Sequence, residues 1–232
     1  MEFGRIQKYI EKLPFTPLQL AVHLYAWSEL VILIFDYFNH KLTANPIQFL
    51  EQHTGLHAIT LLVLSLACTP LNTLFGWREL LKRRRALGLY AFMYAAVHIS
   101  IFVFLDYGLM WNLLAQAFTQ KPYIIYGLVT FLVLLPLVIT SFDIWKVRLG
   151  KNWKRLHQAV YFIAPLAALH FALSVKGDIF RLQGNVAQPV IYAAVIFVLL
   201  ILRVSFIRKY LASLRSQVQA VVNAYLRKIS LT

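Results

Sequence analysis

Long apolar runs alternate with short polar stretches along the whole of this 232-residue chain. A helix needs roughly 20 apolar residues to cross a bilayer, and six of the runs are about that long. Backbone polar groups find no water in lipid, so each run is predicted to be an α-helix. The predicted spans are residues 17–38, 55–76, 86–106, 122–142, 155–175 and 187–207. The pattern therefore predicts an all-α integral membrane protein built as a six-transmembrane-helix bundle.

The composition supports this fold class. Hydrophobic residues make up 60% of the chain and charged residues 14%, whereas soluble domains have about 45–50% and about 25%. The polar stretches are too short to form a soluble domain. The single cysteine, Cys68, excludes an intrachain disulfide, a Cys-rich zinc site and the C-x-x-C-H motif for covalent haem attachment.

The basic residues are distributed unevenly between the two sides of the predicted bundle. A net charge of +14 can indicate nucleic-acid binding. Here, however, three Lys or Arg precede residue 17, five lie in 77–85, five in 143–155 and six from Arg203 onward, nineteen of the 23. Basic residues favour the cytoplasmic side. We therefore expect no nucleic acid, both termini in the cytoplasm and, in a Gram-negative cell, an inner-membrane protein.

The chain divides into three predicted regions. Residues 1–16 form a cytoplasmic arm, 17–207 the membrane domain and 208–232 a basic tail. Apolar residues recur in the tail at three- and four-residue steps, which predicts an amphipathic cytoplasmic helix against membrane lipids. Residues 107–118 are expected to lie similarly on the outer face.

Two histidines fall at one predicted depth. His98 lies in the third span and His170 in the fifth, and these spans run in the same direction. At 1.5 Å per residue both lie roughly 18–23 Å from the inner face. Ionisable side chains inside a membrane need a partner or a function. Two imidazoles at equal depth can clamp a flat metal cofactor such as haem.

A second pair is predicted nearer the inner face. His157 precedes His170 by 13 residues, and Arg84 precedes His98 by 14, so each interval covers about 20 Å. Two stacked cofactors would fit this spacing. Thirteen residues leave His157 about 140° away from His170 around an ideal helix, so Pro165 must alter the helix or the cofactors must lie on different sides. Arg84 is equally explained as a topology charge or a lipid-headgroup contact.

Other histidines leave alternatives open. His23 and His57 can be replacement ligands, quinone contacts or packed side chains, while His40 and His53 are expected in a solvated outer loop. A proton or ion transporter would also place histidines in the membrane, usually with carboxylates, and Glu29 is the main deep one. A membrane anchor without any cofactor is the third alternative.

Several segments carry a family resemblance. "ALGLYAFMYAAVHISIFVFLDYG", "EQHTGLHAITLLVLSLACTPL" and above all "LGKNWKRLHQAVY" resemble the MsrQ family, formerly YedZ, over about residues 15–210. A wider kinship with ferric-reductase-like membrane domains is implied. The resemblance implies non-covalent haem b, one or two per chain, with His98, His157 and His170 on ligand positions and Arg84 as a tentative inner partner.

The resemblance also implies a function. MsrQ proteins pass electrons outward to MsrP, a periplasmic molybdopterin enzyme that reduces methionine sulfoxide in oxidised proteins. Electrons would come from the quinone pool or a cytoplasmic flavin reductase, and FMN rests on the resemblance alone. The sequence has no dinucleotide-binding fingerprint, so an electron carrier of this kind needs a separate donor and acceptor. Sulfoxide reduction would belong to the partner, and the chain would be an electron-transfer subunit.

Overall fold

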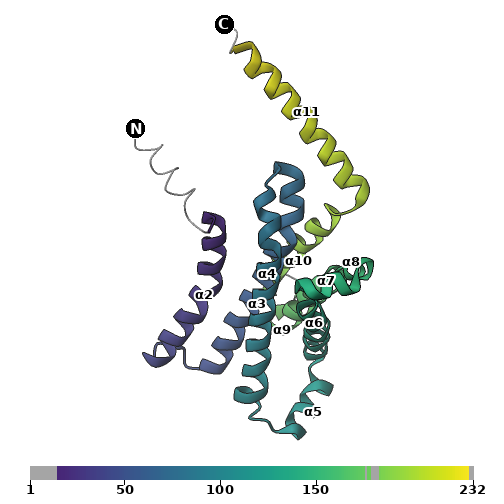
Figure 1. The fold of residues 1–232 in the computed structure, drawn as a ribbon. Coiled ribbons are helices and arrows are strands. Elements are labelled where there is room, and N and C mark those ends of the chain that lie inside the picture. Colours follow the sequence, from purple (N-terminus) through teal and green to yellow (C-terminus); the bar gives the residue numbers. More distant parts are fainter. Residues whose placement is uncertain (1–14, 176, 179–182, 230–232) are drawn as a thin grey trace.

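The computed structural model describes residues 15–175, 177–178 and 183–229, and most of them are helical (Figure 1). The membrane-length helices are joined by short connections and by the shorter helices α5, α7 and α8. The elements are α2 Pro17–Phe38, α3 Pro46–Phe75, α4 Arg78–Ser100, η1 Ile101–Asp106, α5 Trp111–Gln120, α6 Pro122–Ile139, α7 Asp143–Leu149, α8 Lys151–His157, α9 Val160–Ser174, β1 Gly177–Asp178, β2 Gln183–Gly184, α10 Ala187–Ile201 and α11 Ser205–Ile229.

The helices confirm a multi-pass membrane protein. Five of them, taking α4 with η1 and α8 with α9, are long and apolar enough to span a bilayer. A sixth span arises only if α10 is joined to the first part of α11, and the two are bent by 78°. The predicted span 187–207 is thus interrupted after Ile201, and the amphipathic tail helix begins at Ser205.

Three other predicted spans differ from those expected. The third begins at Arg78 instead of residue 86. The second begins at Pro46 instead of residue 55, because Asn45 caps the helix by accepting a hydrogen bond from the Gln48 N–H at 3.2 Å. The fifth is divided into α8 and α9. Around this break the N–H groups of Ala159 and Tyr161 bond to carbonyls three residues back, not four. The irregularity therefore precedes Pro165, which lies inside α9.

The core lies where α3, α4, α9 and α10 meet. Its fully buried side chains include Leu61, Leu66, Tyr94, Ala164 and Ile196. Hydrogen bonds between helices reinforce the packing, as expected where lipid provides no hydrophobic force between helices. Ser65 Oγ donates to the Arg84 carbonyl at 3.0 Å, and the Thr60 and Tyr192 hydroxyls are 2.6 Å apart.

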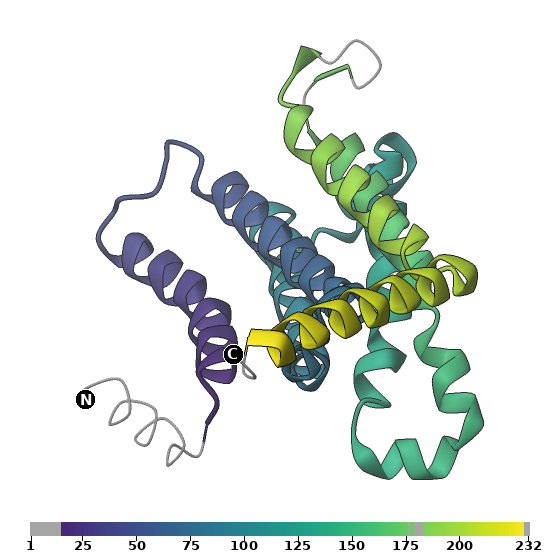
Figure 2. The same cartoon turned by 90° about the horizontal axis from the view of Figure 1, so that it is seen from above.

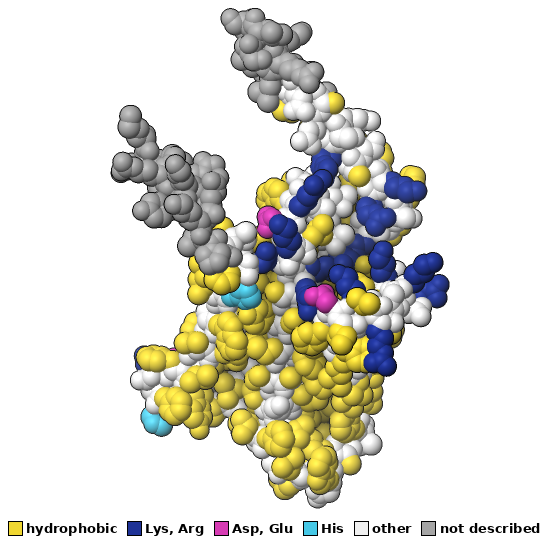
Figure 3. Space-filling view, in the orientation of Figure 1, with side chains coloured by type: hydrophobic (Ala, Val, Ile, Leu, Met, Phe, Trp, Pro, Cys, Tyr) yellow, Lys and Arg dark blue, Asp and Glu magenta, His cyan; other side chains and the backbone are white. Residues whose placement is uncertain are grey.

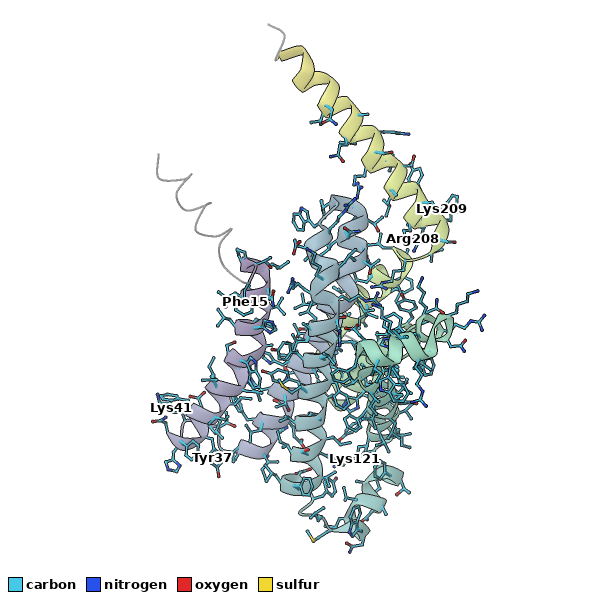
Figure 4. All side chains as sticks on the ribbon, in the orientation of Figure 1. Phe15, Tyr37, Lys41, Lys121, Arg208 and Lys209 are labelled. Carbon is cyan, nitrogen blue, oxygen red and sulfur yellow. The ribbon has the colours of Figure 1, made fainter. Side chains whose placement is uncertain are left out.

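The surface is divided between apolar and basic regions. In Figure 3 apolar side chains cover most of the bundle, and Lys and Arg gather toward the end from which α11 projects. Figure 4 shows Arg208 and Lys209 at that end and Lys41 and Lys121 at the other. Seen from above, α2 stands to one side and α11 crosses the bundle (Figure 2), where Arg215 donates to the Asn72 carbonyl at 3.1 Å.

Candidate functional site

The fold brings the rings of His98 on α4 and His170 on α9 close together. Their ring centroids are 6.1 Å apart and their planes are inclined at 84°. A metal–imidazole bond is about 2.0–2.1 Å long, so two imidazole nitrogens on opposite sides of one metal lie roughly 4 Å apart, with the ring centres about 6 Å apart. The observed separation matches two axial ligands of a single metal ion.

Hydrogen bonds define which nitrogen of each ring is free. His98 Nδ1 lies 3.0 Å from the Glu51 carbonyl oxygen, and His170 Nδ1 lies 2.7 Å from the Tyr123 carbonyl oxygen. A carbonyl only accepts, so Nδ1 carries the proton and donates it in both rings. The lone pair is then on Nε2, and the hydrogen bond both orients the ring and increases its basicity as a ligand.

A large cavity surrounds the two rings. Its volume is about 1010 Å³, at the upper end of the range of roughly 300–1,000 Å³ typical of ligand pockets. Apolar side chains of α3, α4 and α6 line most of it, and polar side chains lie among the lining residues near the first turns of α3, α6 and α10. The apolar lining includes Leu62, Ala91, Ile99, Leu128, Phe131 and Leu134. The polar lining includes Gln48, Gln52, Lys121, Asn185 and Gln188.

The donor set and the cavity fit haem. Two neutral imidazoles are too few ligands for a metal ion held by protein alone. A haem iron already has four porphyrin nitrogens and needs only axial ligands, which histidines commonly provide. The apolar walls suit a flat macrocycle. At the polar end Glu51 and Asp106 also line the cavity, and Lys121 and the side-chain amides there are the groups that can pair with the carboxylates of haem.

Two glycines of the site were missed by the sequence analysis. Gly55 on α3 lies against His98, and Gly127 on α6 lies against His170. Neither belongs to a recognisable motif. The only signal available in the sequence was a glycine inside each of two apolar runs, which can mark a close approach of another group.

The two residues of the predicted inner pair, His157 and Arg84, make no hydrogen bond with each other in the described part of the chain. His157 ends α8, where its ring stacks on Trp153 with centroids 4.2 Å apart, and its Nε2 is 3.1 Å from Thr140 Oγ1. Arg84 is half-buried on α4. Neither residue lines the cavity, and no hydrogen bond connects them among the described residues. The inner site therefore stays a prediction.

The remaining histidines form contacts of their own. His40 lies exposed in the loop as expected. The expectation for His53 was wrong, because α3 begins early enough to include it, and its Nδ1 is 2.7 Å from Glu29 Oε1. His57 Nε2 is 3.6 Å from the other Glu29 oxygen. His23 Nδ1 is 2.7 Å from the Tyr90 hydroxyl, so this ring nitrogen already has a hydrogen-bond partner within the bundle.

Comparisons with known proteins identify the family of this chain. The family described as "Ferric reductase like transmembrane component" matches residues 54–168, which include His98 and His157. A relative from Xanthomonas campestris pv. campestris (strain 8004) is 43% identical over 159 residues, covering 68% of this chain and 70% of its own. A relative from Caulobacter vibrioides is 35% identical over 201 residues, covering 86% and 92%.

Both relatives carry the name "Protein-methionine-sulfoxide reductase heme-binding subunit MsrQ". No solved structure matches the chain. Identity at this level over most of both chains shows common descent, and the ferric-reductase match covers all or part of α3, α4 and α9, three of the four helices that build the core. The chain therefore belongs to the MsrQ family of ferric-reductase-like membrane proteins.

Proposed function

We propose that this protein is a membrane b-type cytochrome of the inner membrane. It relays electrons to a periplasmic molybdopterin reductase of the MsrP type, which repairs methionine sulfoxide in oxidised proteins. The observation that carries the proposal is the facing pair His98 and His170, 6.1 Å apart in a large apolar cavity. The choice of haem as the cofactor and of a methionine-sulfoxide reductase as the partner follows from the names of the relatives.

Each part of the cavity has a role toward the haem. His98 and His170 would hold the iron through Nε2, and a haem iron, when bound, accepts and releases one electron at a time. The apolar walls exclude water. Lys121 at the outer end donates to the Tyr107 hydroxyl at 3.2 Å, and this hydrogen bond raises the pKa of Lys121, which stays charged to pair with a haem carboxylate.

The second haem is proposed at the inner end. His157 would be one ligand and Arg84 its partner. This haem would carry electrons from the cytoplasmic side toward the outer pair. Electron donors of two classes suit this position: the quinone pool, and a cytoplasmic flavin reductase docked on the basic segments 78–85 and 146–155. FMN would accompany the latter. The same basic residues are also explained by membrane topology alone.

Haem loading of purified variants tests this function. Wild-type protein expressed with haem should show a Soret band and a sharp reduced α-band, and pyridine haemochrome should give one or two haems per chain. We expect His98→Ala and His170→Ala each to lose the outer haem, because one axial ligand is removed. His40→Ala, in the exposed loop, is the matched control. Unchanged haem in both site variants would refute the pairing, and a colourless wild type would refute the cytochrome.

One observation favours the alternative of proton movement. Glu29 of α2 contacts both His53 and His57 of α3, at 2.7 and 3.6 Å, inside the bundle. A carboxylate between two imidazoles can pass a proton from one to the other. Proteoliposomes with an internal pH dye and an imposed membrane potential, negative inside, distinguish the two functions: a proton pathway acidifies the lumen without any electron donor, and Glu29→Gln abolishes this. The cytochrome alone leaves the lumen pH unchanged.

A further inference from the structure

The two facing histidines are held by the same local arrangement on two different helices. His98 donates to the carbonyl of Glu51, and the residue four positions later is Gly55. His170 donates to the carbonyl of Tyr123, and the residue four positions later is Gly127. We call each combination, a carbonyl at position i with a glycine at i+4, an imidazole seat.

The chemistry of a helix explains why the glycine stands at i+4. The carbonyl of residue i already accepts the N–H of residue i+4 and has a second lone pair free. Side chains on a helix lean toward its N-terminus, so the side chain at i+4 covers the turn that contains this carbonyl. Glycine leaves the carbonyl uncovered, and the imidazole of a neighbouring helix can reach it from the side.

The distances show how closely the rings approach. A Cβ atom built on Gly127 would lie 2.7 Å from both Nδ1 and Cε1 of His170, closer than side chains tolerate. One built on Gly55 would lie 3.2 Å from the same two atoms of His98. Carbon atoms pack best at roughly 3.5–4.0 Å. Nε2 is farther in both cases, at 3.3 Å for Gly127 and 3.9 Å for Gly55, so an added methyl group would strike first the ring edge that donates the hydrogen bond.

The seats also connect the site to the tertiary structure. α3 packs against α4, and α6 packs against α9, and these are the two most extensive helix pairings in the described part of the chain. Each pair thus contributes one seat and one histidine. The two seated rings meet across the cavity with their planes inclined at 84°.

We propose that Gly55 and Gly127 are positioning residues that fix the tautomer, the position and the ring plane of the two haem ligands. The inference rests on the proposed haem function. A methyl group at either position displaces the imidazole from its carbonyl. The ligand then loses the hydrogen bond that increases its basicity and the Nε2 direction that points at the iron. Weaker donation to ferric iron raises the reduction potential.

Three glycine-to-alanine variants test the proposal as a graded series. Gly88 on α4 is the matched control, because its added Cβ would meet Ser65 Oγ at an ordinary 3.6 Å. Removal of an outer-shell partner typically weakens metal binding by about 10–100-fold. We expect Gly127→Ala to lie in that range, Gly55→Ala to lose less because the neighbour has to move only a few tenths of an ångström, and Gly88→Ala to match wild type.

The measurements are haem titration of apo-protein, the low-spin electron paramagnetic resonance signal and the midpoint potential. Gly127→Ala should lose low-spin signal, and the haem that remains should have a higher midpoint potential than in wild type. If wild type binds haem and all three variants have the same haem affinity, low-spin signal and midpoint potential, the proposed role of Gly55 and Gly127 is wrong. The proposed cytochrome function would be unaffected by that result.

A second measurement, the Tm of the apo-protein, tests the seats even if Gly127→Ala accumulates poorly or wild type binds no haem. Alanine is the better helix former, so the variant is destabilising only through its clash with His170. We expect Gly127→Ala to lower the Tm of the apo-protein when His170 is present and to raise it in a His170→Ala background. The same sign in both backgrounds would overturn the seats. If wild type binds no haem, the proposed function fails, and this reversal still tests the steric claim.

Discussion

His157 is hydrogen-bonded differently from the other two candidate ligands. The Thr140 hydroxyl has one proton, which it donates to the Pro136 carbonyl at 2.6 Å. It must therefore accept from His157, whose Nε2 lies 3.1 Å away. This leaves the His157 lone pair on Nδ1, whereas His98 and His170 have it on Nε2. An inner haem bound through Nε2 has to displace this hydrogen bond.

This competition gives a prediction for Thr140→Val. The variant keeps the shape of the side chain and removes the competing hydroxyl. A net hydrogen bond contributes about 1 kcal/mol, so the inner site should bind haem roughly fivefold more tightly. The measurement is the second step of a haem titration, with His157→Ala as the variant that abolishes it. Ser141→Ala is the control, because its hydroxyl bonds to the Leu137 carbonyl instead. No change in either Thr140→Val or His157→Ala would remove His157 from the ligands.

Helix α2 depends on few polar contacts. Most of its apolar side chains are exposed, as suits lipid, and two tyrosines of α4 attach it. The Tyr94 hydroxyl donates to the Ala26 carbonyl at 2.7 Å, and the Tyr90 hydroxyl contacts His23 at 2.7 Å and Trp27 at 3.2 Å. The tyrosines are four residues apart, so they share one face of α4. Such interhelical bonds contribute on average about 0.6 kcal/mol each in membrane proteins.

Removing both hydroxyls should therefore weaken the attachment of α2. We expect Tyr90→Phe with Tyr94→Phe to lower the Tm in detergent by a few degrees, since roughly 1 kcal/mol shifts a protein of this size by about 2–4 °C. Tyr210→Phe on α11, an exposed position, should leave the Tm unchanged. A double variant as stable as wild type would show that these two hydroxyls do not hold α2, and would leave its packing and the contacts of Glu29 with His53 and His57 to do so.

At the scale of the whole molecule, the charge distribution predicts the orientation in the membrane. Nineteen of 23 basic residues lie on the predicted cytoplasmic side, and Figure 3 shows Lys and Arg side chains concentrated toward one end. Because basic residues near the ends of spans favour the cytoplasm, the loop at residues 39–45 should face the periplasm and α11 the cytoplasm.

Cysteine labelling checks this orientation. In a Cys68→Ala background, a membrane-impermeant maleimide should label Ala44→Cys in intact spheroplasts. It should label Ser213→Cys only after lysis. Cys68 is the single cysteine of the chain, so its replacement leaves the introduced cysteine as the one thiol available for labelling. Labelling of Ser213→Cys before lysis would reverse the topology, and with it the direction of electron transfer.

The sequence determined the fold class, and it predicted six spans where the structure has five membrane-length helices and one bent pair. It also selected His98 and His170 as candidate ligands, whose ring centroids lie 6.1 Å apart in the structure. Apolar runs of this length form α-helices in lipid, because the helix satisfies all its backbone hydrogen bonds internally. A histidine inside such a run stands out, because an ionisable side chain there needs a partner or a function. The same local signals predicted α2 at its observed bounds. They missed the early start of α3, because the cap at Asn45 and Pro46 lies outside the apolar run that marked the span.

Only the tertiary structure decided how the rings are held. Which carbonyl accepts from His98 or His170, and why Gly55 and Gly127 must lack a side chain, depends on contacts between residues 47 and 43 positions apart in the chain. The break between α8 and α9 likewise made the ideal-helix angle between His157 and His170 inapplicable. Spacing along a chain fixes depth in the membrane, since rise per residue is constant, but the direction of a side chain depends on the neighbouring helix.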